Sequence, residues 1–535
     1  MSELFKRIDR LTEIGVALSA ESDIDKLLEL IMTGAMSLTH ADGGSFYFLE
    51  DGELSFEIIA NDSLELKMGG TSGNPITFPS IPLSVNGEEN HGNVVSHCVL
   101  AGKTINIEDA YNEAGFDFTG TRSFDSKIGY RTQSMLTFPL KDHEQEIIAV
   151  LQLINARDMV TGEILPFGQV EQQLAESLAS QAAVALTQRR LINGLEALFE
   201  SFIKMIASAI DDKSPYTGGH CRRIPVLTMM LAEAVNKTEY GALGRFQISD
   251  EDRYELETAA WLHDCGKVVT PEYVMDKSTK LETISDRISV IETRFEVLRR
   301  DAEIEFLRAI SRGDCDQHSR ERLNRKFAAD CRQLQDDLAF LRKINVGGEF
   351  MHCEDIERVK QMANTEWLDS SGERRPLLTD DEVMNLCIER GTLNDEEREV
   401  INSHIVATIK MLESLPFPKH LQNVPEYAGG HHEKMDGSGY PRGLTREQMS
   451  VQARIMAVAD IFEALTARDR PYKHGKKLSE CLRIMGQMKL DNHIDPDLFD
   501  IFVREKVYLT YAEEFLDPEQ IDNIDEAAIP GYVVS

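Results

Sequence analysis

Residues 431–441 read His-His-Glu-Lys-Met-Asp-Gly-Ser-Gly-Tyr-Pro, and no other stretch constrains the chain as strongly. Neighbouring side chains on an α-helix point about 100° apart, so His431 and His432 can share a ligand only at a helix end or in a loop. The two glycines and the proline prevent a helix from continuing through the stretch. We therefore expect a loop, which either presents two imidazoles to a ligand or is an ordinary polar surface turn.

The bulk properties exclude several classes of protein. With 535 residues, of which 42% are apolar, the chain is long enough for about two to four domains with packed cores. Its net charge of −34 disfavours binding to nucleic acid, because such a surface repels phosphates. The eight cysteines include no Cys-x-x-Cys pair, and no long uncharged apolar run or secretory signal is present. We expect a cytoplasmic protein with no membrane span and no nucleic-acid partner.

The first part of the chain mixes helical and strand patterns. Apolar residues at helical spacing predict a helix within residues 1–22. Alternation within residues 45–49 and 54–59 predicts a hairpin, and apolar runs at 135–140 and 147–154 predict central strands. Residues 23–165 are therefore expected to form an α+β domain with a central antiparallel sheet and helices.

This α+β part resembles a GAF domain of the small-ligand sensor type. The resemblance rests on residues 41–45, on residues 105–111, and on a Phe-Asp pair that leads to Gly-Tyr-Arg-Thr within residues 124–136. It implies a small ligand, with a cyclic nucleotide as the candidate. The residues implied to bind it are Phe124, Asp125, Tyr130, Arg131 and Thr132. The alternative is a GAF domain that serves only dimerisation.

A long connecting helix is expected over residues 166–204. Leu191, Leu195, Leu198 and Phe202 recur at spacings of three and four, and the outer face of the predicted helix is polar. Such a stripe is either ordinary core or a seam that pairs with the same helix of a second chain. We expect the second arrangement, a parallel homodimer.

The remainder of the chain reads as strongly helical. Residues 205–510 are expected to form one all-α domain, which is interrupted by a charged, amphipathic insertion at residues 283–392. Two antiparallel helices and a loop around residues 346–348 are predicted for this insertion. Residues 511–535 are acidic with little periodicity, which predicts a tail.

Imidazoles and carboxylates recur in this helical part in distinctive settings. His220 follows a turn that enters a helix, and the pair His263-Asp264 is predicted within an apolar helix. His404 is predicted within a helix over residues 397–412, and Asp460 within a further apolar helix. Unpaired buried aspartates would cost several kcal/mol, which bound cations would offset. Without thiolates, the ligand set suits iron, manganese, nickel or zinc and disfavours a structural zinc site. Two metals that share a carboxylate would use all seven candidates, whereas the alternative is a set of histidines satisfied by hydrogen bonds. The candidates are His220, His263, Asp264, His404, His431, His432 and Asp460.

The order of these residues, with Gly439-Tyr440-Pro441 after the histidine pair, resembles the HD-GYP subgroup of HD-domain phosphohydrolases over about residues 200 to 500. The resemblance implies an all-α domain that hydrolyses the bacterial second messenger cyclic di-GMP to linear pGpG or GMP. It implies one metal held by His220, His263, Asp264 and Asp460. It also implies that Asp264 bridges to a second metal held by His404, His431 and His432. Tyr216 stands where members with a third metal carry a glutamate, so we expect two metals, iron or manganese.

Two metals with a bridging carboxylate would supply hydroxide for in-line attack on a phosphodiester. Lys267 follows His263 by about one helical turn, so it is a candidate to bind a phosphate or to protonate the leaving oxygen, beside the catalytic Asp264. Arg470 and Lys473 would supply the local positive charge that an acidic protein needs for a dianionic ligand. The resemblance assigns the pocket wall to Gly439, Tyr440 and Pro441, with Arg442 extending the same loop.

The predicted fold is therefore multidomain, with an α+β GAF domain followed by an all-α HD-type metal phosphohydrolase domain that carries a helical insertion. Two other functions stay open at this point. In the first alternative, the chain is a receptor that binds cyclic di-GMP without cleaving it. In the second, it is a phosphohydrolase of another nucleotide or cyclic dinucleotide.

Overall fold

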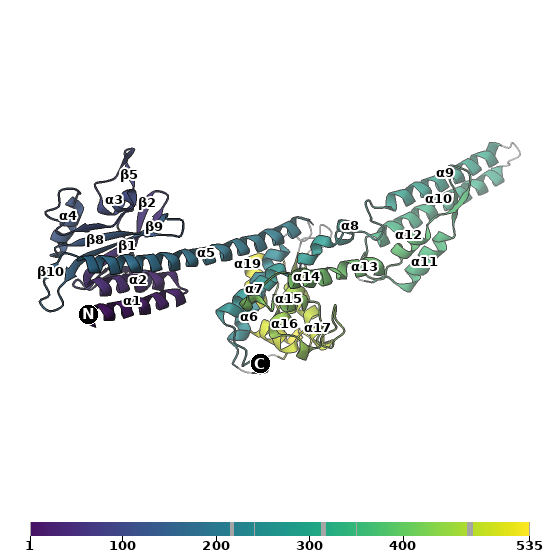
Figure 1. The fold of residues 1–535 in the computed structure, drawn as a ribbon. Coiled ribbons are helices and arrows are strands. Elements are labelled where there is room, and N and C mark those ends of the chain that lie inside the picture. The colour runs from purple at the N-terminus through teal and green to yellow at the C-terminus, as the bar shows by residue number, and fades with distance from the viewer. Residues whose placement is uncertain are drawn as a thin grey trace. The chain divides into compact units, whose positions relative to one another are not determined.

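The computed structural model describes residues 2–213, 219–239, 241–311, 317–348, 350–467 and 475–533 (Figure 1). The chain divides into two compact units, one of residues 1–199 and the other of residues 200–535. Helix α5 (Gln169–Lys213) begins in the first unit and ends in the second. Among the described residues, no helix combines the length and the apolar character that crossing a membrane requires.

The N-terminal unit is built on one antiparallel sheet, as the alternating sequence pattern predicts. Its strand order is β3-β2-β1-β9-β8-β7, and β4 and β10 extend β2 and β9. The predicted hairpin is confirmed, because β1 and β2 pair in antiparallel register, starting with the pair of Glu50 and Glu53 next to the turn. The strands of this sheet are β1 (Ala41–Glu50), β2 (Glu53–Asn61), β3 (Leu66–Gly69), β4 (Ile81–Pro82), β7 (Ile105–Ile107), β8 (Met135–Lys141), β9 (Ile147–Arg157) and β10 (Ile164–Leu165).

Helices cover both faces of this sheet (Figure 1). On one face, α1 (Ser2–Ala20), α2 (Ile24–Thr39) and the start of α5 share a core with inward residues of the central strands, including Phe46, Phe138 and Leu151. On the other face lie α3 (Val94–Ala101) and α4 (Thr119–Ile128). A short hairpin, β5 (Ser84–Val85) with β6 (Glu88–Glu89), and the turn η1 (Gly70–Ser72) complete the unit.

The C-terminal unit is helical. Side-chain caps set several helix starts: Ser249 begins α7 and Asn394 begins α13, each with the reciprocal acidic residue three positions on. Ser450 caps α16 in the same way without a reciprocal partner. Its helices outside the insertion are α6 (His220–Asn236), α7 (Asp250–Leu262), η2 (Cys265–Val269), α8 (Glu272–Met275), α13 (Asp395–Asn402), α14 (His404–Glu413), η3 (Lys419–Leu421), α15 (Val424–Gly429), η4 (Arg446–Gln448), α16 (Val451–Thr466), α17 (Leu478–Leu490), α18 (Pro496–Arg504), α19 (Val507–Phe515) and η5 (Glu526–Ala528).

The insertion is more elaborate than two helices and a loop. Its two long helices, α9 (Ile288–Ser311) and α10 (Gln317–Asn345), run antiparallel, since Phe306 stacks on Phe327 at 5.1 Å while Glu292 pairs with Arg342. The insertion also contains α11 (Cys353–Ala363), the hairpin β11 (Glu366–Leu368) with β12 (Arg374–Pro376), and α12 (Asp380–Leu386). These elements close a separate apolar core around Ile291, Leu341 and Leu386.

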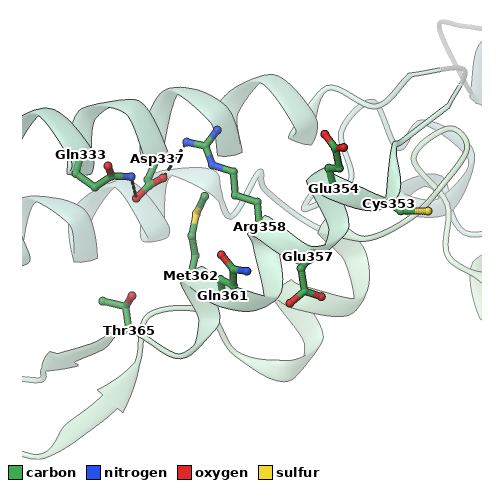
Figure 2. A pocket seen from close by; sticks show the side chains of 9 residues that line it. All are labelled: Gln333, Asp337, Cys353, Glu354, Glu357, Arg358, Gln361, Met362 and Thr365. Carbon is green, nitrogen blue, oxygen red and sulfur yellow. Dashed lines mark hydrogen bonds and ion pairs between the residues drawn. The ribbon is translucent and has the colours of Figure 1, made fainter.

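Between α10 and α11 the insertion has an open hollow of about 880 Å³. Figure 2 shows that charged side chains from both helices border it, with Arg358 of α11 bonded to Asp337 of α10 at 2.9 Å. Glu354 and Glu357 give it a net acidic rim. None of the candidate metal ligands lies on this surface.

The C-terminal residues differ from the expected tail. Residues 507–515 form α19, whose Tyr511 is fully buried. Beyond it, Gln520 donates to the carbonyl oxygen of Thr466, and Ile529 is buried against Gly486. The segment is therefore packed on the helical unit, and its lack of periodicity reflects isolated anchoring residues in an irregular backbone.

Candidate metal centre

Five segments of the chain, most of them helix ends or turns, bring the seven candidate ligands together. His220 opens α6, His263 follows the end of α7, and Asp264 precedes η2. The others come from the start of α14, from the turn after α15, and from the middle of α16, and they are His404, His431, His432 and Asp460. The loop predicted for the paired histidines is confirmed by the turn after α15.

Two details of this layout correct the sequence analysis. The pair His263-Asp264 does not lie inside an apolar helix, because α7 ends at Leu262 and the backbone turns into η2. His404 is not in the middle of a helix either, since α13 ends at Asn402 and α14 begins at His404. These three ligands therefore lie at helix ends, where the chain direction changes and neighbouring side chains can reach a common point.

Gly266 allows two of these elements to approach. A Cβ atom at this position would lie 2.0 Å from the carbonyl oxygen of His404 and 2.5 Å from the backbone nitrogen of Thr408. The backbone N–H of Gly266 also donates to the Thr408 hydroxyl at 2.9 Å. Glycine is required here because any side chain would separate η2 from α14, and with it Asp264 from His404.

The first group of ligands surrounds the Oδ2 atom of Asp264. The Nε2 atoms of His220 and His263 each lie 3.3 Å from this oxygen and 3.2 Å from one another. Oδ1 of Asp460 lies 3.4 Å from Nε2 of His220 and 3.9 Å from Nε2 of His263. Four donors from three segments thus converge, and the three residues other than Asp460 are buried.

The second group of ligands lies beside the other oxygen of the Asp264 carboxylate, Oδ1. Oδ1 of Asp264 is 3.3 Å from Nε2 of His404, which in turn is 3.3 Å from Nε2 of His432. His431 completes the group, and its ring centroid is 4.1 Å from that of His432. Asp264 therefore stands between both imidazole groups, one oxygen toward each.

Hydrogen bonds on the far side of the rings aim the Nε2 atoms at this centre. Nδ1 of His263 donates to the Ala260 carbonyl at 2.8 Å, Nδ1 of His404 to Ile401, and Nδ1 of His431 to Ala428 at 2.7 Å. A proton on Nδ1 leaves Nε2 with a free lone pair, the form in which histidine binds metals. Nε2 of His431 is buried and has no hydrogen-bond partner among the described residues. Such an orphaned acceptor fits a metal ligand, and so does the nitrogen and oxygen donor set.

The pKa shifts favour a charged carboxylate at Asp264 and neutral imidazoles at His431 and His432. Burial alone would raise the pKa of Asp264, but Lys267 and the surrounding imidazoles hold it well below its usual range. Burial and the neighbouring His431 lower the pKa of His432 to about 2, and burial lowers the pKa of His431 as well. His220 differs, because the charge of Glu463 outweighs its burial and raises its pKa to about 10. Carboxylates and unprotonated rings are the forms that bind divalent cations.

Glu463 supports this centre and was missed by the sequence analysis. Its carboxylate is 1% exposed and lies 2.5 Å from Nδ1 of His220. Arg223 holds the other oxygen through Nε at 2.7 Å and Nη2 at 2.6 Å. Glu463 lies three positions after Asp460 in α16, so both carboxylates face α6. That spacing was the only sequence signal for its role.

The Gly-Tyr-Pro loop is held by a second buried carboxylate. Glu433 accepts hydrogen bonds from the backbone N–H groups of Arg442 at 2.7 Å and Leu444 at 2.9 Å. A Cβ atom at Gly439 would lie 2.4 Å from the backbone nitrogen of Lys434, so only glycine fits. The ring of Tyr440 stacks on His432 with centroids 4.9 Å apart, and the Tyr440–Pro441 peptide is cis. The loop thus lies directly against the second ligand group.

The other residues predicted to bind substrate lie in different settings: one at the metal centre, one on the surface and two outside the described residues. Lys267 is 23% exposed, and its ammonium lies 2.5 Å from Oδ2 of Asp264. The guanidinium of Arg442 pairs with Glu413 at 3.0 Å on the surface. Arg470, Lys473 and the Tyr216 position lie outside the described residues.

Asp125, one of the predicted GAF-ligand residues, has its carboxylate engaged within the fold. It is 1% exposed and accepts bonds from the backbone N–H of Thr132 at 2.8 Å, the Thr132 hydroxyl at 3.0 Å and the Tyr111 hydroxyl at 3.0 Å. These contacts tie α4, which contains Phe124, to the segment that precedes β8. In this state Asp125 and Thr132 stabilise the domain, and their role in ligand binding stays a prediction.

Tyr130 and Arg131 lie beside that segment. The Tyr130 hydroxyl donates to the buried carboxylate of Asp42 at 2.6 Å and accepts from Nδ2 of Asn155 at 2.9 Å. The guanidinium of Arg131 is exposed and lies 5.1 Å from the centroid of the Tyr111 ring. Of the five predicted residues, Arg131 is the one whose polar group the structure shows on the surface.

Comparison with known proteins identifies the two domains. The GAF domain family matches residues 23–186, and the HD domain family matches residues 379–498. The 3'3'-cGAMP-specific phosphodiesterase 1 of Vibrio cholerae is 40% identical over 114 residues, which are 21% of this chain and 26% of that protein. A cyclic di-GMP phosphodiesterase of Pseudomonas aeruginosa is 47% identical over 74 residues (14% and 17%), and one of Thermotoga maritima is 34% identical over 125 residues (23% and 33%).

The chain therefore spans no more than a third of the length of these three relatives. The HD match includes His404, His431, His432 and Asp460 and begins after His220, His263 and Asp264. The structure is what joins those three residues to the matched segment. A part that matches the GAF domain family is therefore followed in this chain by a part that matches the HD domain family.

Proposed function

We propose that this protein is a metal-dependent phosphodiesterase that hydrolyses cyclic di-GMP to linear pGpG or GMP. The observation that carries the proposal is the position of Asp264, with one carboxylate oxygen toward His220 and His263 and the other toward His404. Two imidazole groups on either side of one carboxylate suit a dinuclear site. The names of the relatives from Vibrio, Pseudomonas and Thermotoga support a cyclic dinucleotide as substrate.

In this proposal, His220, His263, Asp264 and Asp460 hold one divalent cation, and Asp264, His404, His431 and His432 hold the other. Iron and manganese suit these nitrogen and oxygen donors. When bound, such cations lower the pKa of a water toward neutrality and offset the charge that develops on phosphorus. The chain's own part is to keep the Nε2 atoms of His263, His404 and His431 unprotonated and aimed inward, which the three Nδ1-to-carbonyl bonds do.

Lys267 is proposed to bind a substrate phosphate. Its side chain reaches the centre and is partly exposed, so an incoming anion can contact it. Although burial opposes it, the charge of Asp264 raises the pKa of Lys267 above its usual value. A lysine that holds its proton so firmly is a better fixed cation than proton donor. Of the two roles that the sequence left open, this favours phosphate binding over protonation of the leaving oxygen.

The Gly-Tyr-Pro loop is proposed as the wall of the substrate pocket. Tyr440 is half-buried and already stacked on His432, so its ring can also contact a guanine base that lies above the metals. Gly439, Pro441 and Arg442 continue this wall, and Arg442 would exchange Glu413 for substrate. Arg470 and Lys473 are proposed as further contacts to the dianionic ligand.

The activity test uses the full chain loaded with Mn²⁺ or, anaerobically, with Fe²⁺. It is incubated separately with cyclic di-GMP and with 3'3'-cGAMP, and products are separated by liquid chromatography. Release of pGpG or GMP with either metal supports the proposal. Binding of cyclic di-GMP without product would favour the receptor function. Turnover of 3'3'-cGAMP alone would make that dinucleotide the substrate, a second candidate favoured by the relative from Vibrio cholerae.

We also propose that the protein is a parallel homodimer paired through α5, and that the GAF domain regulates the HD domain through a small ligand. Leu191, Leu195, Leu198, Phe202 and Met205 recur at spacings of four and three and are each more than half exposed. An exposed stripe with this spacing is typical of a coiled-coil seam. Light scattering should give the mass of two chains, and Leu195→Glu with Leu198→Glu should give the mass of one. A monomeric parent protein at micromolar concentration would refute the pairing.

A further inference from the structure

The last turn of α5 contacts the backbone on both sides of the first ligand group. We propose that Asp211 and Lys213 are positioning residues for the metal centre, which they hold through the two segments that carry His220 and Asp264. The inference rests on the proposed metal-dependent function. It adds two residues that neither contact the ligands' side chains nor fall within the matched HD segment.

Asp211 acts on the segment that carries His220. Its carboxylate is buried, with 6% exposed, and accepts hydrogen bonds from the backbone N–H groups of Gly219 at 3.1 Å and Cys221 at 3.3 Å. These groups belong to the N-terminus of α6, where Gly219 itself offers no side-chain cap. Helix N-termini present unsatisfied N–H groups and partial positive charge, which a carboxylate stabilises. Asp211 thus caps α6 from another helix and fixes the residues on both sides of His220.

Lys213 acts on the segment that follows Asp264. Its ammonium donates to the carbonyl oxygens of Lys267 at 3.1 Å, Val268 at 2.6 Å and Thr270 at 2.6 Å. These carbonyls end the short helix η2, which begins directly after Asp264. A cation at a helix C-terminus stabilises the terminal carbonyl groups, which carry partial negative charge. Lys213 therefore fixes the far end of the turn that places Asp264 and Lys267.

The two contacts have a common consequence. One turn of one helix supplies an anion to the start of α6 and a cation to the end of η2, so it sets the distance between His220 and Asp264. That distance is 3.3 Å between Nε2 and Oδ2, and a metal site tolerates only small errors in such spacings. Because α5 begins at Gln169, within the residues that match the GAF family, a displacement of this helix would reach both ligand segments together.

The test measures metal affinity in the full chain, independently of any substrate. Asp211→Ala and Lys213→Met remove the two contacts, and Lys213→Arg restores a cation that can bond carbonyls. Matched controls on the same helix are Asp212→Ala, at the exposed neighbour of Asp211, and Lys204→Met, whose ammonium pairs only loosely with Glu200 at 3.6 Å. The dissociation constant for Mn²⁺ is measured by competition with a chelating dye, and helicity is checked by circular dichroism.

We expect Asp211→Ala and Lys213→Met to weaken Mn²⁺ binding about tenfold or more, as supporting contacts around metal ligands do. Lys213→Arg should recover most of the affinity, and both controls should bind as the parent does. Parent-like affinity in Lys213→Met would overturn the proposal, even if Asp211→Ala fails to fold. Equal losses in the controls would overturn it as well. A parent protein that binds metal but does not cleave cyclic di-GMP would count against the proposed function and leave this test intact.

Discussion

Replacing Glu463 by glutamine tests whether the buried carboxylate beside His220 governs metal binding. Although burial alone would raise it, His220 and Arg223 lower the pKa of Glu463 to about 2, so the group is charged at neutral pH. The substitution keeps the size of the side chain and removes the charge that three short bonds share, one to His220 and two to Arg223. The half-buried guanidinium of Arg223 and the buried imidazole of His220 then lose this charged partner.

The expected loss of metal affinity follows from two independent ranges, one for hydrogen-bond energies and one for the support of metal ligands. Hydrogen bonds to charged groups contribute about 1.5–3 kcal/mol each, and loss of a partner that orients a ligand histidine weakens metal binding about 10–100-fold. The second range corresponds to roughly 1.4–2.7 kcal/mol, so the two overlap near 2 kcal/mol. We expect Glu463→Gln to raise the dissociation constant for Mn²⁺ about 30-fold, mainly at the site that contains His220.

The assay is metal titration with a competing chelator, together with metal content after dialysis. The matched control is Glu233→Gln, which breaks a carboxylate–arginine pair with Arg253 in the same unit but touches no histidine. Both variants should lose some thermal stability, whereas only Glu463→Gln should lose metal. If both variants kept the affinity of the parent, the role given to Glu463 would be refuted.

Three further substitutions test other parts of the structure. Asp264→Asn should lose both metals and all turnover, because Asp264 stands between the two imidazole groups; a variant with normal metal content would contradict the ligand scheme. Glu433→Gln should retain both metals but raise KM several-fold, because it loosens the loop held at Arg442 and Leu444, and an unchanged KM would count against that loop as pocket wall. In the GAF unit, burial alone would raise the pKa of Glu171, but the ion pair with Arg7 lowers it. The charged carboxylate therefore stabilises the fold at pH values above the pKa of the unfolded state, near 4.3, and this contribution is lost as the pH falls below it. Glu171→Gln should therefore lower the free energy of unfolding at pH 7 by less than about 1 kcal/mol, seen as a slightly lower melting temperature. The difference in melting temperature from the parent should shrink toward pH 3.

Regular patterns were predictable from the sequence, and their interruptions were not. Alternation identified the hairpin of β1 and β2, and helical spacing identified α5. The break at Ser403 lies within a continuous apolar pattern that includes Ile401 and Ile405, so nothing in the spacing marks it. The break depends on contact with η2, whose Gly266 fits against the backbone of His404. Tertiary contact overrides local pattern in such places.

The support of the ligands was also beyond sequence reasoning. Histidines stand out because they are rare and chemically distinct, whereas Glu463, Asp211 and Lys213 are common charged residues in a chain with 28% charged residues. What distinguishes them is burial and partner geometry, such as the 2.5 Å bond from His220 to Glu463. These quantities depend on residues far apart in the chain. A sequence can therefore suggest which residues bind a metal more readily than which residues hold them in place.

The insertion falls in sequence between Asp264 and His404, whose Oδ1 and Nε2 atoms lie 3.3 Å apart. It therefore has to be accommodated without separating these two ligands. The structure closes the two ends of the insertion onto each other. Lys277, whose side chain is fully buried, bonds Glu397 at 2.7 Å and Asn385 at 3.1 Å, and the Thr392 hydroxyl donates to the Lys277 carbonyl at 2.9 Å. The chain thus leaves and returns at one point. Since the entropy cost of closing a loop grows only slowly with its length, clamping its ends fixes the site whatever lies between them.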